Sequence, residues 1–361
     1  GFVPQQRALK ERSRGRAIPL KRFHNDVKRG LIEGYGFQVS SLLDLACGRG
    51  GDLNKWFDAE IGRVVGVDLS SREIDEAKKR YRELMRDIDS GKRRRGQREF
   101  MVEFSQTDQI GVKSPLDFGG QNKKFGAVSC MFAIHYFFES EDAARNLLKT
   151  VSESLVDGGH FFGVLPDGEK VQKMLSDRSS VSNPVFSLKW SRRTEESKDK
   201  PGSEFGCGYI FALTDTVTAD IEDSEGSLEY LTFEKSLVRL AADYDLIPVT
   251  QYTHPRLRRL VSGPDSQTVF KHFAPQYVGP DARDLEEVSF LNCAFVFKKS
   301  HKAVGGESSP SKSSQLASGS LAAEVTQAAQ GPDDLPRATD LGCEEGEPAV
   351  PTTKRHKFDG E

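Results

Sequence analysis

The residues best suited to chemistry in this chain are a glycine turn and two carboxylates that follow short apolar runs. The run Leu42–Leu45 leads into the turn Ala46–Gly51, and a second run, 64–67, ends at Asp68. An apolar run followed by glycines and helix-compatible sequence is typical of a strand, a tight turn and a helix start. Two such strands, adjacent and parallel, would place the turn beside Asp68 and form a nucleoside-binding crevice.

The glycine turn lacks the third glycine of the G-x-G-x-x-G pattern with which dinucleotide enzymes approach a pyrophosphate. This disfavours a nicotinamide oxidoreductase and fits a nucleoside ligand without pyrophosphate, of which S-adenosylmethionine is the obvious one. We expect Asp68 to accept hydrogen bonds from both ribose hydroxyls, and Asp108, ending a third strand, to accept from the adenine amino group. A single aspartate at a strand end is usually a turn or cap residue, but carboxylates at successive strand ends favour a site.

These side chains need a parallel sheet to bring them together. Apolar runs predict strands at 42–46, 63–68, 100–104, 125–132 and 161–165. Helical spacing predicts helices at 20–33, 51–57 and 140–155, and a further helix from a cap at Ser70 or Ser71 through Leu84. Strands alternating with helices predict an α/β fold, a Rossmann-like doubly wound and mostly parallel sheet.

The second half of the folded part has a different pattern. Residues 170–204 are polar, and we expect them to run over the surface. Strands are predicted at 205–213, 227–232 and 292–299, with a helix at 234–244. They are interpreted as the later part of the sheet together with a region that covers the substrate.

Composition indicates one large domain and a tail. The 361 residues are divided into a basic N-terminal segment, 1–13, a folded domain, 14–300, and a tail, 301–361, that is too poor in apolar residues to order itself. Five dispersed cysteines indicate a reduced intracellular compartment, and no apolar run is long enough to span a membrane. Basic clusters in residues 1–29 and 92–98 favour an anionic partner such as RNA, although solvated surface faces are the plainer interpretation of each cluster alone.

Further motifs narrow the class of protein. The glycine turn continues as Gly50-Gly51-Asp52-Leu53 to Lys55-Trp56, and the fourth predicted strand ends in the segment FAIHYFFES at 132–140. FGCGY follows at 205–209, and Glu-Tyr-Leu at 229–231. Over residues 12–299 the chain resembles the mRNA cap guanine-N7 methyltransferases, which implies the class I methyltransferase fold with an inserted cap-binding region.

The resemblance implies roles for individual residues. Lys28 falls on the lysine that meets the methionine carboxylate of S-adenosylmethionine, and Asp52 on the aspartate near its amino group. The cofactor-binding positions it implies are Lys28, Ala46, Gly48, Asp52, Asp68, Asp108 and Met131. The cap-binding positions are Asn25, His135, Tyr136, Pro166, Glu229 and Asn292.

The chemistry of the acceptor agrees with such a site. Guanine N7 carries no proton and can attack the methyl group directly, so catalysis can rest on positioning by His135, Tyr136 and Glu229, with no general base. Glu229 would accept from the guanine N1–H and exocyclic amine, and Tyr136 would pack near a base that becomes cationic. We expect no metal and no covalent intermediate.

The chain departs from the family pattern at several positions. Ala46 stands in place of a glycine, Met131 in place of a glutamine, and Asn292 about where a cap-contacting tyrosine is expected. Two alternatives therefore stay open: a small-molecule methyltransferase, and a weakly active paralogue that binds RNA. The resemblance implies the nucleus, the capped 5′ end of mRNA as partner, other capping enzymes or an activating subunit as further candidates, and no membrane.

Overall fold

The computed structural model describes residues 15–94, 96, 98–118, 120, 123–192, 194, 203–213 and 226–301. The predicted basic segment 1–13 and, apart from His301, the predicted tail lie outside the described residues.

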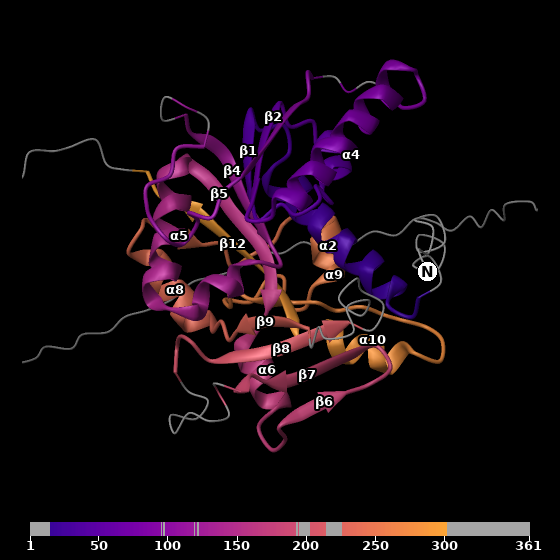
Figure 1. Ribbon diagram of the computed structural model, residues 1–361, viewed down its shortest axis with the longest axis vertical. Helices are drawn as coiled ribbons and strands as arrows, with labels where there is room; N and C mark the ends of the chain where they lie inside the picture. The colour runs from indigo at the N-terminus through magenta and orange to yellow at the C-terminus, as the bar shows by residue number, and fades with distance from the viewer. Residues whose placement is uncertain are drawn as a thin grey trace, which may run out of the picture. The chain divides into compact units, whose positions relative to one another are not determined.

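The main sheet has eight strands among the described residues, seven of them in the order β10-β12-β5-β4-β1-β2-β3, with β11 pairing β12 (Figure 1). Neighbours from β5 to β3 are parallel, and β12, β10 and β11 pair antiparallel. The strands are β1 (Ser41–Leu45), β2 (Arg63–Asp68), β3 (Met101–Gln106), β4 (Phe125–Met131), β5 (Leu155–Pro166), β10 (Leu246–Pro248), β11 (Lys271–His272) and β12 (Asn292–Lys299).

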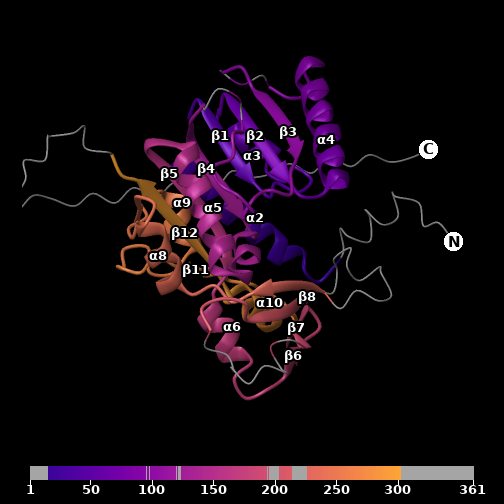
Figure 2. The same cartoon turned by 60° about the vertical axis from the view of Figure 1, so that its left-hand side comes forward.

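Helices cover both faces of this sheet (Figures 1 and 2), as the doubly wound prediction requires. One face packs against α2 (Ile18–Tyr35), α3 (Leu53–Asp58), α4 (Ser71–Asp89) and α9 (Pro255–Leu260). The other packs against η1 (Ile134–Glu139), α5 (Glu141–Ser154) and α8 (Glu234–Ala242). Side chains that alternate along each strand supply both cores; Leu42, for example, faces the first set and Leu43 the second.

Local sequence sets where two of these helices begin. The Ser70 hydroxyl accepts from the Glu73 amide at 3.3 Å, and the Ser140 hydroxyl accepts from the Ala143 amide at 3.2 Å. Both are N-caps that satisfy a free amide of the first turn. The predicted cap before α4 is therefore confirmed at Ser70.

A second, antiparallel sheet has four strands in the part of the chain that the structure describes, in the order β6-β7-β8-β9, and lies beyond the end of β5 (Figure 2). Its strands are β6 (Ser180–Ser182), β7 (Phe186–Trp190), β8 (Gly208–Leu213) and β9 (Ser227–Tyr230), and α6 (Gly168–Met174) and α10 (Ala282–Ser289) share its core. The prediction that 170–204 only runs over the surface is wrong in its described part, because apolar residues such as Phe186 and Leu188 are buried there.

Two strand ends also differ from their predictions. β5 begins at Leu155, directly after α5, rather than at 161. β3 ends at Gln106, so Asp108 follows the strand by two residues. The Thr107 amide donates to the Asp68 carbonyl at 2.9 Å, which holds the start of this loop beside the end of β2.

The turn after β1 uses the left-handed backbone region three times. Gly48 and Gly50 have φ of 52° and 65°, which glycine adopts at no steric cost. Ala46 has φ of 59°, and its Cβ makes that conformation unfavourable. The departure from glycine at this position is therefore a strained residue in the middle of the candidate site.

Replacing Ala46 by glycine should relieve this strain. We expect Ala46→Gly to raise the free energy of unfolding by about 0.5–1 kcal/mol, since the relief exceeds the extra chain entropy that glycine loses. Urea denaturation measures the change. The matched control is Ala127→Gly in β4, where φ is not positive and the same substitution should destabilise. If Ala46→Gly and Ala127→Gly destabilise the protein equally, Ala46 is not strained.

Candidate active site

The glycine turn and Asp68 meet at the carboxyl ends of β1 and β2, as predicted. The Cys47 amide donates to the Val67 carbonyl at 2.9 Å and ties the turn to β2. Asp68 accepts from the Gly48 amide at 2.8 Å and from the Ser70 amide at 2.9 Å. Each carboxylate oxygen keeps a further lone pair, so Asp68 is a fixed acceptor that can still bind hydroxyl groups.

Asp52 is the centre of a buried charge network. It lies just before α3, with its side chain 2.6 Å from the Lys28 ammonium of α2 and 2.7 Å from that of Lys55. Lys55 also donates to the Asn25 side chain at 2.8 Å. Burial by itself raises the pKa of Asp52, but the two lysines outweigh it and hold that pKa below its ordinary value.

The role of Lys55 was missed in the sequence, although it stands in the quoted Gly-Asp-Leu-x-Lys-Trp stretch. Its side chain is buried, and burial lowers its pKa despite the attraction of Asp52. A lysine two residues into a short helix usually points to solvent, so only packing reveals its partner. In the sequence, the only sign that Lys55 belongs to the site is its spacing of three residues from Asp52 in this stretch.

A second buried carboxylate, Asp44 of β1, lies near this network. It accepts a hydrogen bond from the Ser129 hydroxyl of β4. Burial, reinforced by the negative charge of Asp52, raises the pKa of Asp44 to about 7. This residue was read only as part of the first strand, and nothing in its spacing predicted its contact with Ser129.

These residues fit an S-adenosyl group. Its methionine end carries one positive and one negative charge, and Lys28 and Asp52 offer one of each. The fixed Asp68 carboxylate offers acceptors for ribose hydroxyls. The turn is open at Gly48, where no atom of the described residues beyond its two chain neighbours lies within 4 Å of the place a Cβ would take.

A second group of predicted residues surrounds a buried histidine and glutamate. His135 in η1 is buried, and neither ring nitrogen has a hydrogen-bond partner among the described residues. Its Nε2 lies 3.6 Å from Oε2 of Glu229 in β9, too far for a hydrogen bond. Burial lowers the pKa of His135 to about 3 and raises that of Glu229 to about 7, so the imidazole is neutral.

The same group contains two tyrosines. The Tyr136 ring packs beside His135, with ring centroids 4.4 Å apart, and its hydroxyl is 2.9 Å from that of Ser227. Tyr136 is partly exposed, whereas Tyr209 of β8 is buried and donates to Oε2 of Glu229 at 2.9 Å. Tyr209 is the last residue of the FGCGY segment, but nothing in the sequence predicted a role for it.

The remaining predicted positions lie on β4, β5, β12 and the loop after β3. Pro166 ends β5 and faces Asn292 across the β5–β12 pair, where the Asn292 amide donates to the Val288 carbonyl at 2.9 Å. Met131 ends β4 and is buried. Asp108 lies in the loop after β3 and accepts from the Gln109 side chain.

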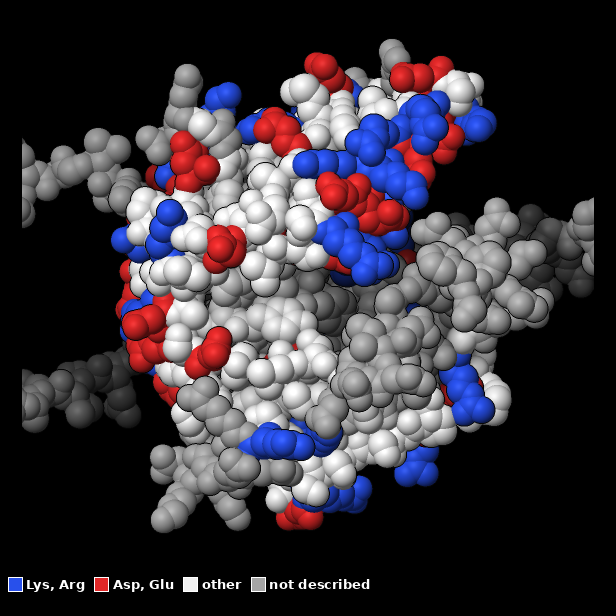
Figure 3. All heavy atoms as spheres, viewed as in Figure 1, with Lys and Arg blue, Asp and Glu red and all other residues white. Residues whose placement is uncertain are grey.

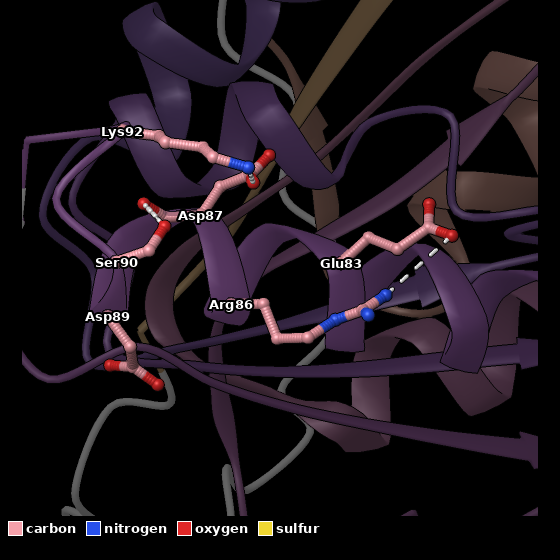
Figure 4. Close-up of a pocket in the computed structure, with 6 residues that line it drawn as sticks. All are labelled: Glu83, Arg86, Asp87, Asp89, Ser90 and Lys92. Carbon is pink, nitrogen blue, oxygen red and sulfur yellow. Dashed lines mark hydrogen bonds and ion pairs between the residues drawn. The ribbon is translucent and has the colours of Figure 1, made fainter.

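A hollow at the end of α4 is lined by exposed groups joined by local ion pairs such as Lys92–Asp87 at 3.7 Å (Figure 4). Basic and acidic side chains alternate over α4 (Figure 3). Arg93, from the predicted basic cluster, pairs with Asp58 at 2.5 Å and packs on Phe57. At least this member of the cluster has a structural partner.

The described residues contain neither a metal-binding cluster nor a membrane-spanning helix. No group of three or more histidine, cysteine, aspartate or glutamate side chains is placed to hold a metal ion. None of the described helices is long and apolar enough to cross a membrane.

A mostly parallel, doubly wound sheet with a glycine turn after β1 and a fixed carboxylate ending β2 is a nucleoside-binding arrangement, and an S-adenosylmethionine-dependent methyltransferase is one class of enzyme that it fits. The sequence model of the mRNA (guanine-N(7))-methyltransferase domain matches residues 3–261. The chain belongs to this family, and its activity is methyl transfer to N7 of the mRNA cap guanine.

Curated relatives are named as mRNA cap guanine-N(7) methyltransferases. mRNA cap guanine-N(7) methyltransferase 1 of Oryza sativa is 30% identical over 299 residues, 81% of this chain and 77% of the relative. The Arabidopsis thaliana protein of that name is 29% identical, over 83% of this chain and 80% of the relative. Among solved structures, an S-adenosylmethionine-dependent methyltransferase from Clostridium acetobutylicum has a TM-score of 0.45 at 15% identity, covering 78% of this chain and 92% of that one.

The buried network makes a stability prediction. Asp52→Asn removes the charge that balances two ammonium groups, so the free energy of unfolding should fall by about 2–4 kcal/mol. The control is Asp58→Asn, where the carboxylate also meets two cations, Arg29 and Arg93, but is 39% exposed. That change should cost less than about 1 kcal/mol because water screens the pairs. Similar losses in urea denaturation would contradict the role of burial.

Proposed function

We propose that this protein transfers the methyl group of S-adenosylmethionine to N7 of the terminal guanine of GpppN-capped mRNA, by in-line attack without a general base. The observation that supports guanine as the methyl acceptor is the buried pair His135 and Glu229. A carboxylate accepts from the guanine N1–H and exocyclic amine, and a neutral imidazole N–H can donate to O6. Adenine presents a donor where guanine has O6 and an acceptor where it has N1–H, so this pair rejects adenine.

The absence of a general base follows from the chemistry of the nucleophile. S-adenosylmethionine supplies a methyl group made electrophilic by its sulfonium. N7 has an in-plane lone pair and no proton to lose, so the protein needs only to hold N7 in line with the methyl carbon. As the N7–C bond forms, the bond between the methyl carbon and sulfur would break with its electron pair staying on sulfur, so that neutral S-adenosylhomocysteine is the leaving group. The positive charge would then lie on the guanine, where the Glu229 carboxylate and the Tyr136 ring stabilise it.

The cofactor half of the proposal uses the charge network. Lys28 and Asp52 bind the two charges of the methionine end, with Lys55 completing the cationic side, and Asp68 binds the ribose. Asp108 binds the adenine amine, and backbone or apolar contacts come from Ala46, Gly48 and Met131. No metal takes part in this mechanism.

The rest of the cap lies against Asn25, Pro166 and Asn292 in this proposal. Asn25 accepts from Lys55, which links the two halves of the site, and Asn292 adjoins Pro166 across the β5–β12 pair. The 14–300 region acts as the methyltransferase domain, with the basic segment 1–13 and the tail 301–361 outside it. We further propose a nuclear location, with the capped 5′ end of mRNA as the partner.

The decisive test uses purified protein and three acceptors. Methyl transfer should be efficient to GpppG-ended RNA, weak to free GTP and absent with ApppG-ended RNA. Glu229→Ala should lower turnover by at least about a hundredfold while S-adenosylmethionine binding, measured by calorimetry, is retained. Asp68→Ala should abolish that binding. The exposed Glu99→Ala is the matched control and should change neither.

Each competing function predicts a different result. A small-molecule methyltransferase would methylate metabolites and leave GpppG-ended RNA unmodified. An inactive RNA-binding paralogue would bind RNA in a salt-sensitive way without binding the cofactor. Either outcome would overturn the proposed reaction.

The pH dependence follows from the raised pKa of Glu229. Below about pH 7 the carboxyl is protonated and cannot accept from both guanine groups, so kcat/KM for the cap should fall, approaching tenfold per pH unit. The facing groups do not titrate there, because the pKa of His135 is about 3 and those of Tyr136 and Tyr209 are raised above 10.

Asp44 also has a pKa of about 7, so the measurement is made at saturating S-adenosylmethionine. Glu229→Gln should remove the acidic limb. If the fall in kcat/KM at acidic pH persists unchanged in Glu229→Gln, that fall is due to another group.

A further inference from the structure

The strand pair β8–β9 places a tyrosine directly opposite the guanine-reading carboxylate. Tyr209 and Glu229 are register partners in this antiparallel pair, so their side chains project from the same face. The Tyr209 hydroxyl donates to Oε2 of Glu229 at 2.9 Å. The ring is 1% exposed and packs in the core of the small sheet.

No other side chain in the described residues donates a hydrogen bond to Glu229. His135 is 3.6 Å from the same oxygen and is neutral, and none of the described lysines and arginines pairs with the carboxylate. Burial of Glu229 favours its protonated form, and the hydrogen bond from Tyr209 is the one favourable contribution to the ionised form. A donor on an ionised carboxylate makes a stronger bond than a neutral pair does.

The hydrogen bond also fixes the orientation of the carboxylate. A glutamate side chain has three rotatable bonds, and its terminal torsion is broad, so an untethered carboxylate samples many directions. With Oε2 held by Tyr209, the plane of the group is set while Oε1 and the second lone pair of Oε2 stay available. The N1–H and exocyclic amine of guanine need two such acceptors side by side.

We propose that Tyr209 is a specificity-determining positioning residue, whose hydroxyl holds the Glu229 carboxylate in the orientation that reads the N1–H and the exocyclic amine of the cap guanine. This inference rests on the proposed function of the site. Tyr209 acts through Glu229 and need not touch the base.

The test removes the hydroxyl and keeps the ring. Wild type and Tyr209→Phe are compared on GpppG-ended RNA and on IpppG-ended RNA, in which hypoxanthine lacks the exocyclic amine. Wild type should prefer guanine. In Tyr209→Phe, kcat/KM for the guanine cap should fall about tenfold or more, chiefly through KM, and the guanine-to-inosine ratio should fall toward one.

Three controls separate positioning from a general structural effect. Tyr209→Phe should bind S-adenosylmethionine as wild type does in calorimetry. Tyr81→Phe also removes a hydroxyl bond, to the Phe100 carbonyl at 3.1 Å, and should leave the ratio unchanged. In a Glu229→Gln background, where the guanine-to-inosine ratio is already reduced, adding Tyr209→Phe should change that ratio no further.

The outcomes distinguish this inference from the proposed reaction. An unchanged guanine-to-inosine ratio in Tyr209→Phe, whether activity is retained or both acceptors lose activity equally, would overturn the role of Tyr209. A further fall in the ratio on adding Tyr209→Phe to Glu229→Gln would overturn it as well. Failure of the wild type to methylate GpppG-ended RNA would overturn the proposed reaction itself.

Discussion

Two ammonium groups from different helices converge on the buried carboxylate of Asp52, and the candidate site depends on this contact. Lys28 comes from α2 and Lys55 from α3, so the pairing fixes both helices against the turn after β1. Removing Asp52 leaves two ammonium groups without a counter-charge in a medium that solvates them poorly. Asp68 fixes the opposite side of the turn through backbone amides. Charged and backbone groups together hold the glycine turn in an open conformation.

The two halves of the site bind through different kinds of interaction, in keeping with their proposed ligands. The cofactor half, on the main sheet, is built from full charges, which suit a zwitterion. The acceptor half is built from a neutral histidine, tyrosines and one carboxylate, which suit a base read by hydrogen bonds. β9 and η1 pack against each other, so the small sheet brings Glu229 to His135 at the end of the main sheet. Neither half forms a site for methyl transfer alone.

The departures from the family pattern have different physical consequences. Ala46 keeps the left-handed backbone that glycine would adopt without strain, so the turn retains its conformation at some cost in stability. Met131 is buried at the end of β4 and offers no hydrogen-bonding amide. Asn292 directs its amide to the Val288 carbonyl, which anchors α10 to β12. None of the three residues disrupts the sheet that positions the site.

The sequence by itself determined the doubly wound sheet, the glycine turn, the place of Asp68 and the grouping of His135, Tyr136 and Glu229. The sheet, the turn and the place of Asp68 follow from apolar periodicity and turn residues, which are local properties. The grouping of His135, Tyr136 and Glu229 is what the resemblance to the family implies. Only the tertiary structure revealed that Lys55 is buried against Asp52, that Tyr209 holds Glu229, and that 170–204 includes strands of a second sheet. Such features depend on contacts between residues far apart in the chain. Burial, which shifts the pKa of Asp44 and Glu229, exists only once those contacts form.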